Sequence, residues 1–333
     1  AEIYLTVGGE SIEWAQAVNT LAAIAFVRSD LDAAEEGYRT ALDVVRGVAE
    51  GSPAECEVLG NLGLLAMRRG DFDHARDFFR REMDSAGRLG SDTPQFSHAA
   101  NYLGLLAKNM GRYDEARRYY EQALVAFRKT RPGGIEMAGV LTNLANVALL
   151  EGNLEAARRH HEEGLLLRQG LDPESADVAT SLHNVGIVAK WQGDLETARR
   201  FLEQALRLKA TFSPGSVWIA NTLFELGDVA RVEGKLQESE RSHLSALEIY
   251  RRVTPRHPRV SMSLFALGAV EQARGRSEVA EKLWREAIAI IEERRQGMQV
   301  SDEDRSQFGA RYYAYYGRLA RLLVDQGRAA EAW

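Results

Sequence analysis

The chain has 333 residues, of which 45% are hydrophobic and 27% charged, with 7 prolines and a net charge of −6. This composition is typical of a globular protein and excludes collagen, Pro-rich linkers and broad disorder, while the negative charge argues against a general nucleic-acid binder. No apolar run is long enough to span a membrane, and the first ten residues lack the pattern of a signal peptide. We therefore expect a soluble, cytoplasmic protein with no membrane partner.

A repeated segment runs through the chain. It is clear at residues 61–75 and 102–116, which read NLGLLAMRRGDFDHA and YLGLLAKNMGRYDEA. A turn residue recurs at a constant spacing of 41 residues, at Ser29, Gly70, Gly111, Gly152, Gly193, Gly234 and Gly275. A period of this length is typical of solenoids that are built from helical hairpins.

Each repeat predicts two helices. In the second repeat the first helix covers about residues 54–69, with apolar residues at helical spacing, and the second covers about residues 72–89. Glycine at the turn accepts the left-handed backbone that ends a helix, and the Asp or Asn that often follows it suits a helix N-cap. The N-cap candidates are Asp71, Asn153 and Asp194.

Small residues recur at two positions of the second helix, where closely packed helices need them. The first position holds Ala34, Ala75, Ala116, Ala157, Ala198, Ser239 and Ala280. The second holds Ala41, Ala123, Gly164, Ala205, Ala246 and Ala287, and Glu82 is its exception. The residue after the second position is large and apolar throughout, as in Leu124 and Leu206, which predicts that it fills the space between neighbouring repeats.

This pattern resembles the tetratricopeptide repeat (TPR), and its 41-residue period with the Asn-Leu-Gly opening is similar to the repeats of kinesin light chains. The resemblance covers residues 12–296 and leaves residues 1–11 as an extension. It implies an all-α, right-handed superhelical solenoid with seven TPR hairpins. The first and last repeats depart from the pattern at Ala22, Ser29, Ser277 and Val279.

The C-terminal end departs from the period. Residues 297–307 are a charged insert, and residues 308–333 read as a partial eighth repeat, with an aromatic-rich helix at 308–323. This end resembles the junction that precedes the caspase-like protease domain of bacterial TPR–CHAT proteins. The matching residues are Leu322, Leu323, Gly327, Arg328, Glu331 and Ala332. The resemblance implies that a protease domain follows in the full-length protein, and that this chain itself carries no catalytic domain.

Nothing in the sequence predicts an enzyme, a metal site or a cofactor site. Cys56 lies between Glu55 and Glu57, which disfavour a reactive thiolate. His160 and Glu163 are the two side chains of one His/Glu cluster that share a helix face, and two ligands are too few for a structural metal. His161, in the same cluster, falls on a position that holds Tyr38, Phe79, Tyr120 and Leu202 in other repeats, which predicts packing.

Arginine pairs recur every 41 residues, at Arg117–Arg118, Arg158–Arg159 and Arg199–Arg200. A row of this kind can follow a phosphate backbone, which is a weaker alternative function involving RNA or a ribonucleoprotein. Acidic residues one turn away, Glu121, Glu162 and Glu203, can instead pair with these arginines on a solvated face. We favour the solvated face, and so regard a nucleic-acid partner as a minor alternative.

The TPR resemblance implies that the first helices line a concave groove, which is the usual binding surface of a solenoid. Polar residues recur on that side, and asparagine, a poor helix former, is frequent among them. Its amides either bind the backbone of an extended peptide or tie neighbouring first helices together, and both uses remain open. The candidate partner-binding residues are Asn19, Asn61, Asn101, Lys108, Asn143, Asn146, His183, Asn184, Lys190, Trp191, Asn221, Phe224, Glu225, Asp228 and Arg231.

Two aromatic features add to this surface. Trp191 can anchor a partner or pack under the next turn, and Phe224 with Phe265 forms an apolar stripe that can receive a partner or the chain's own next domain. The sequence therefore predicts a non-catalytic scaffold that recruits or senses a protein or peptide through the groove. The alternative is a regulatory sensor arm of a TPR–CHAT protease.

Overall fold

A computed structural model describes residues 11–253, 258–296 and 312–331, and these form 15 α-helices, one short 3-10 helix and no strand. The predicted insert at 297–307, the first residues of the predicted helix at 308–323 and most of the predicted extension at 1–11 lie outside these ranges. The chain divides into two compact units, Ala1–Leu171 and Asp172–Trp333. Each unit is described by itself.

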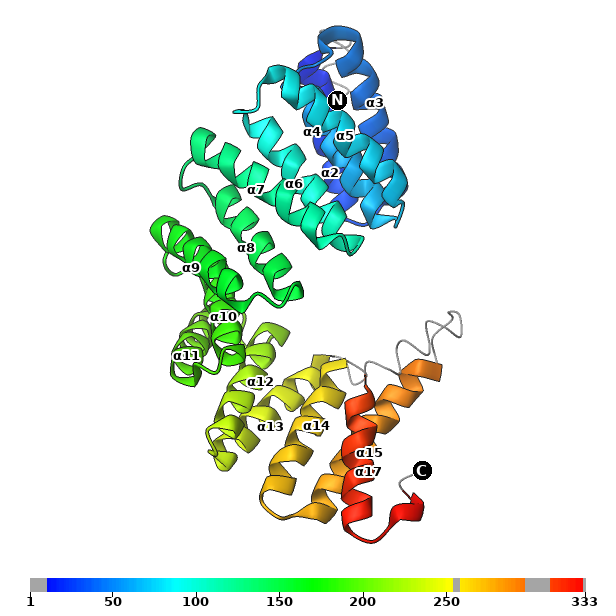
Figure 1. The fold of residues 1–333 in the computed structure, drawn as a ribbon. Coiled ribbons are helices and arrows are strands. Elements are labelled where there is room, and N and C mark those ends of the chain that lie inside the picture. Colours follow the sequence, from blue (N-terminus) through cyan, green and yellow to red (C-terminus); the bar gives the residue numbers. More distant parts are fainter. Residues whose placement is uncertain (1–10, 254–257, 297–311, 332–333) are drawn as a thin grey trace. The chain divides into compact units, whose positions relative to one another are not determined.

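The first unit is a stack of four helical hairpins (Figure 1). Each first helix contacts its own second helix, and the first helices of the first three hairpins also contact the first helix of the next hairpin. The hairpins are α2 (Ile12–Val27) with α3 (Leu31–Ala49), α4 (Pro53–Arg68) with α5 (Phe72–Leu89), α6 (Pro94–Asn109) with α7 (Tyr113–Thr130), and α8 (Ile135–Leu150) with α9 (Leu154–Leu171).

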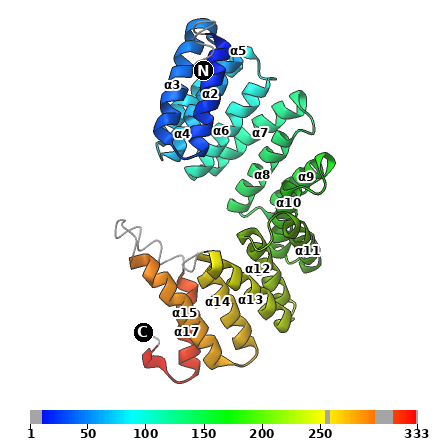
Figure 2. The same cartoon turned by 180° about the vertical axis from the view of Figure 1, so that it is seen from behind.

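The second unit continues the same pattern and ends in one further helix, which packs against α15 (Figure 2). Its hairpins are α10 (Ala176–Trp191) with α11 (Leu195–Phe212), α12 (Val217–Val232) with α13 (Leu236–Val253), and α14 (Pro258–Ala273) with α15 (Ser277–Gln296). The last elements are α17 (Tyr313–Asp325) and the 3-10 helix η1 (Ala329–Glu331). The predicted all-α solenoid of paired helices is confirmed.

The turns within the hairpins adopt the backbone that the sequence predicts. The turn glycines have positive φ angles, such as 79° at Gly70 and 76° at Gly152, and Ser29 takes the same conformation at 67°. The predicted N-caps are also present. The side chains of Asp71, Asn153 and Asp194 each accept a hydrogen bond from the backbone N–H three residues later.

In five of the seven hairpins a glycine of the first helix lies directly against a side chain of the second helix, at Gly63, Gly104, Gly186, Gly227 and Gly268, whereas the fourth hairpin carries Ala145 there. A β-carbon on Gly104 would lie 2.7 Å from two ring carbons of Tyr120 in the partner helix, and one on Gly227 would lie 2.7 Å from the ring of His243. The first repeat, which carries Ala22 at this position, has Gly37 in the facing helix. A β-carbon on Gly37 would lie 2.7 Å from that of Ala22, so the small residue has moved to the other helix.

The small residues of the second helices lie in the core, as predicted. All seven residues at the first small position, from Ala34 to Ala280, are fully buried. At the second position the exception, Glu82, is also buried, with 2% of its surface exposed. Burial at every repeat is expected when the core is a series of interfaces between neighbouring hairpins.

The contact between Gly104 and Tyr120 generates a stability prediction. We expect Gly104→Ala to destabilise the protein by about 1–3 kcal/mol, because the added methyl group has no space beside the ring. Gly139→Ala is the matched control, since Gly139 is helical and a β-carbon there meets no atom within 4 Å. It should be neutral or stabilise by up to about 1 kcal/mol. Urea unfolding of both variants measures this, and equal changes would contradict the packing argument.

Candidate functional site

The predicted groove residues of the first unit form amide pairs between neighbouring first helices. Asn61 Nδ2 donates to Asn19 Oδ1 at 2.9 Å, which joins α4 to α2, and Asn143 Nδ2 donates to Asn101 Oδ1 at 3.1 Å, which joins α8 to α6. Asn19 Nδ2 in turn donates to Glu57 Oε1 at 2.8 Å. The amides therefore do tie first helices together.

These amides keep capacity for a ligand. An asparagine side chain has two N–H donors and an oxygen with two lone pairs, and each helix-to-helix bond uses one of them. Asn61, Asn101, Asn143 and Asn146 are half-buried, so a ligand can reach them, whereas Asn19 is 3% exposed. Lys108 is half-buried on the same side, and burial lowers its pKa.

In the second unit, the structure brings Lys190, Glu225 and Asp228 together as an ion-pair network. Lys190 Nζ lies 2.5 Å from Glu225 Oε2 and 3.4 Å from Asp228 Oδ2. Burial alone would lower the pKa of Lys190, but the two carboxylates outweigh it and raise the pKa. Arg231, also predicted, lies 3.8 Å from the Asp228 carboxylate.

Sequence reasoning missed two members of this network. His243 Nε2 lies 3.8 Å from Asp228 Oδ1, and Arg259 lies 3.9 Å from Glu225 Oε1. His243 occupies the packing position of a second helix, and burial lowers its pKa to about 4. The sequence did contain a signal for His243, because a titratable histidine stands at a packing position that holds an aromatic residue or leucine in most other repeats. Arg259 gave none, because it follows Pro258 at a helix start.

A second polar cluster surrounds the predicted residues His183 and Asn221. Thr222 Oγ1 lies 3.1 Å from His183 Nδ1 and accepts a hydrogen bond from Lys209 Nζ at 2.9 Å. Asn221 Oδ1 accepts from the Tyr250 hydroxyl at 2.7 Å. Burial lowers the pKa of His183 to about 3 and that of Lys209 to about 8. Asn184, the next predicted residue, is half-buried.

The predicted aromatic residues differ in their accessibility. Trp191 is 54% exposed and can contact a partner. Phe224 is buried with its ring edge-on to His243, at 5.1 Å between centroids. Phe265 stacks on Tyr315 of α17 at 3.9 Å, so a helix of this chain covers that end of the predicted stripe.

The first arginine of each repeated pair has acidic partners. Arg158 pairs with Glu162 at 2.9 Å, as predicted, and Arg199 pairs with Glu233 at 2.6 Å. Arg117 pairs with Asp114 at 2.6 Å, an acidic residue on the opposite side from the predicted one. These pairs compensate the positive charge that a phosphate backbone would need.

The His/Glu cluster is structural. His161 is buried at its packing position, and Glu162 and Glu163 pair with Arg158 and Arg128. Within the described ranges, no group of three or more His, Cys, Asp or Glu side chains is placed to hold a metal ion. Cys56 is buried, and this burial raises the pKa of its thiol.

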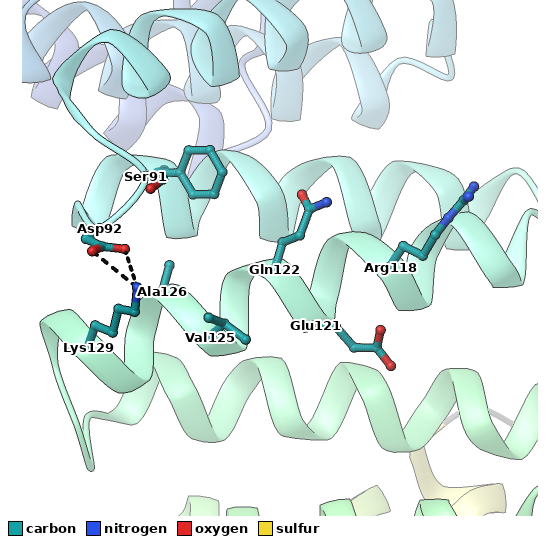
Figure 3. A pocket seen from close by; sticks show the side chains of 9 residues that line it. Ser91, Asp92, Arg118, Glu121, Gln122, Val125, Ala126 and Lys129 are labelled. Atoms are coloured by element: carbon teal, nitrogen blue, oxygen red, sulfur yellow. Dashed lines mark hydrogen bonds and ion pairs between the residues drawn. The ribbon is translucent and has the colours of Figure 1, made fainter.

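A hollow of about 430 Å³ lies along α7 (Figure 3). Lys129 closes one end by donating to both Asp92 oxygens, at 3.0 and 3.2 Å. Val125 contributes an exposed apolar side chain. Among the described residues that line the hollow, no buried polar side-chain atom lacks a hydrogen-bond partner. Lys129 and Asp92 satisfy each other, and we assign this hollow no ligand.

The Lys190 network generates a second prediction. Lys190→Met leaves the carboxylates of Glu225 and Asp228 without their ammonium partner in a largely buried site, and we expect a loss of about 2–4 kcal/mol in unfolding free energy. Lys108→Met is the control, because Lys108 has a similar partly buried setting on a first helix. Urea unfolding at neutral pH compares the two. Equal unfolding free energies of the two variants would show that the ion pairs of Lys190 with Glu225 and Asp228 do not stabilise the fold.

A third prediction concerns acid stability. Burial lowers the pKa of His161 from 6.5 to about 4, so between these values the unfolded chain binds a proton that the folded chain does not. Stability from this group is thus lost as pH falls from about 6.5 towards 4. His161→Leu introduces the residue that the next repeat carries at this position, Leu202. It should reduce the slope of the unfolding free energy against pH by the equivalent of up to about one proton. Urea unfolding across this pH range measures it, and parallel curves for the variant and the wild type would refute it.

A family model described as tetratricopeptide repeat matches residues 14–86, 136–211 and 218–293, and a second tetratricopeptide repeat model matches residues 97–129. No curated protein matches the chain. No helix among the described residues is long and apolar enough to cross a membrane.

Several solved structures share the fold. The apo form of RapI is 13% identical, covers 96% of this chain and 95% of its own, and superposes with a TM-score of 0.71. The apo form of the quorum sensor NprR from B. thuringiensis is 15% identical, covers 96% of both chains and has a TM-score of 0.63. A putative kinesin light chain from Podosopora anserina with nearly identical TPR-like repeats is 17% identical, covers 61% and 98%, and has a TM-score of 0.51.

Proposed function

Because the chain belongs to the tetratricopeptide repeat family, we propose that it is a non-catalytic scaffold that binds an extended peptide or protein segment along its first helices. The observation that carries the proposal is the row of half-buried amides on α4, α6 and α8. Each amide keeps donors and acceptors beyond its bond to the neighbouring helix. An extended peptide backbone offers complementary N–H and C=O groups at regular spacing.

The polar clusters of the second unit support the same proposal. Lys190, Glu225 and Asp228 hold one another in place, so that a partner meets fixed charges. Trp191, at the end of α10, adds an exposed aromatic side chain of the type that is enriched in binding hot spots. Fixed charges with an aromatic anchor reduce the side-chain ordering that binding would otherwise require.

The similar structures extend the proposal towards sensing. RapI and NprR each cover nearly all of this chain, and NprR is described as a quorum sensor. At 13% and 15% identity they share the fold alone, so a sensing role comes to this chain only as part of the proposal. Recruitment and sensing both begin with the same binding event.

A second candidate function is that of a regulatory arm for a caspase-like CHAT protease domain in a longer protein. It is favoured by the way α17 continues the stack, since Tyr315 covers Phe265 and Arg328 pairs with Glu281 at 2.6 Å. A change in the solenoid would reach α17 through these contacts. Sequencing the gene beyond the codon for Trp333 and weighing the natural protein test this candidate, and a stop codon within one further helix would remove it.

The peptide proposal predicts the effect of removing two amides. A library of displayed random dodecapeptides is selected on the wild-type protein, and the best binder is titrated against Asn61→Ala/Asn143→Ala, which removes two amides of the row. We expect about tenfold weaker binding, since two polar contacts are lost, with a change of about 1 kcal/mol or less in unfolding free energy. Asn109→Ala is the matched control, because Asn109 is an exposed asparagine at the end of α6. Unchanged affinity of the double variant would exclude the amide row as the binding surface.

A further inference from the structure

In the second repeat the second helix carries a large residue where the other repeats have a small one, and the first helix carries a small residue where its neighbours have a large one. We call this pair of changes the Glu82–Gly60 exchange. Glu82 of α5 stands where the other six repeats carry alanine or glycine, and it is 2% exposed. Gly60 of α4 stands where the first helices on either side carry Asn19 and Asn101. A β-carbon on Gly60 would lie 3.1 Å from Glu82 Oε2 and 3.0 Å from the ring of Tyr102. The carboxyl of a second helix therefore occupies the space that a first-helix side chain fills in the adjacent repeats.

This exchange places the Glu82 carboxyl in the wall of a cavity of about 340 Å³. The cavity opens among the first helices α2, α4 and α6, on the same side as the amide row, and Asn61 of that row lines it. The Glu82 Oε2 atom is buried and has no hydrogen-bond partner among the described residues. A buried carboxyl oxygen without a partner is costly, so this group is available to bind a cationic donor from outside.

The other charged and titratable groups around the cavity leave the carboxylates in excess. Glu57 is exposed at the rim, where it accepts a hydrogen bond from Asn19, and Arg131 is neutralised by Glu136 at 2.8 Å. Burial lowers the pKa of His98, so that it is uncharged at neutral pH. Burial likewise keeps two further groups neutral, because it raises the pKa of the Tyr102 hydroxyl to about 12 and raises that of the Cys56 thiol.

We propose that this cavity receives the cationic side chain of a lysine or arginine from a peptide bound along the first helices, with Glu82 as its buried ionic partner and Glu57 at the rim. The inference rests on the proposed function and adds a sequence requirement for the peptide. Desolvation holds the pKa of Glu82 well above its usual value in the free protein. The arriving cation thus displaces the proton of the Glu82 carboxyl, which passes to solvent.

The test uses displayed random dodecapeptides selected separately on the wild-type protein and on Glu82→Gln. We expect lysine or arginine to be enriched at one peptide position with the wild type and not with Glu82→Gln. In titrations of a synthetic wild-type binder, replacing that residue by norleucine should weaken binding about tenfold or more for the wild type and less than about twofold for Glu82→Gln. Affinity for the wild type should also rise as the pH is raised from the acid side, because deprotonated Glu82 binds the cation, and this rise should be smaller in Glu82→Gln, where His98 still titrates.

Two further variants keep the outcome clear. Glu57→Gln, at the exposed rim, should weaken binding of the lysine or arginine peptide by a smaller factor than Glu82→Gln does. It tests the cavity even if Glu82→Gln folds poorly. Glu121→Gln removes an exposed carboxylate from α7 and should change nothing. Peptides that bind the wild type without a basic residue at a fixed position would overturn this inference and leave the proposed function intact. Failure to select any peptide would overturn both.

Discussion

Close contact between a first-helix glycine and a large second-helix side chain limits the distance between the two helices in five of the seven hairpins, and the solenoid depends on that distance. In α6 and α7 a single added methyl group would already clash with the Tyr120 ring. The first repeat satisfies the same constraint in another way, with Ala22 facing Gly37. What recurs through the chain is thus a small residue at the contact between the two helices, and either helix can provide it. The small residues at the first small position of the second helices are likewise fully buried in every repeat.

Because the contacts between helices are so close, residue type varies between repeats mainly on the first-helix side. Its residues contact a neighbouring first helix on one edge and solvent on the other, so polar groups there are partly satisfied and partly available. In the first unit asparagine amides occupy this side, and in the second unit an ion-pair network does so. Asparagine pairing and ligand binding are compatible, because one amide can serve both.

The Glu82–Gly60 exchange shows that one repeat can bury a carboxyl at a small-residue position without a change of fold. A carboxyl takes the place of a small side chain in the buried layer and reaches the first-helix side, where Gly60 leaves space for it. Large and small residues that compensate across an interface are tolerated because packing responds to their summed volume. In the binding that we propose, the burial that makes this carboxyl costly in the free protein would also make it selective for a cation.

The sequence by itself determined the architecture, since a strict 41-residue period, turn glycines and small residues at fixed positions restrict each repeat to a helical hairpin, and the turn backbones and N-caps agree with it. It also identified polar first-helix residues and marked Glu82 as an exception. Tertiary structure alone decided their partners. The pairing of Asn61 with Asn19, the contact of His243 with Asp228 and the covering of Phe265 by Tyr315 join residues that are far apart along the chain. Period and residue type specify a side chain's position on a helix, whereas its partner depends on the distance and rotation between helices, which arise only when the hairpins pack.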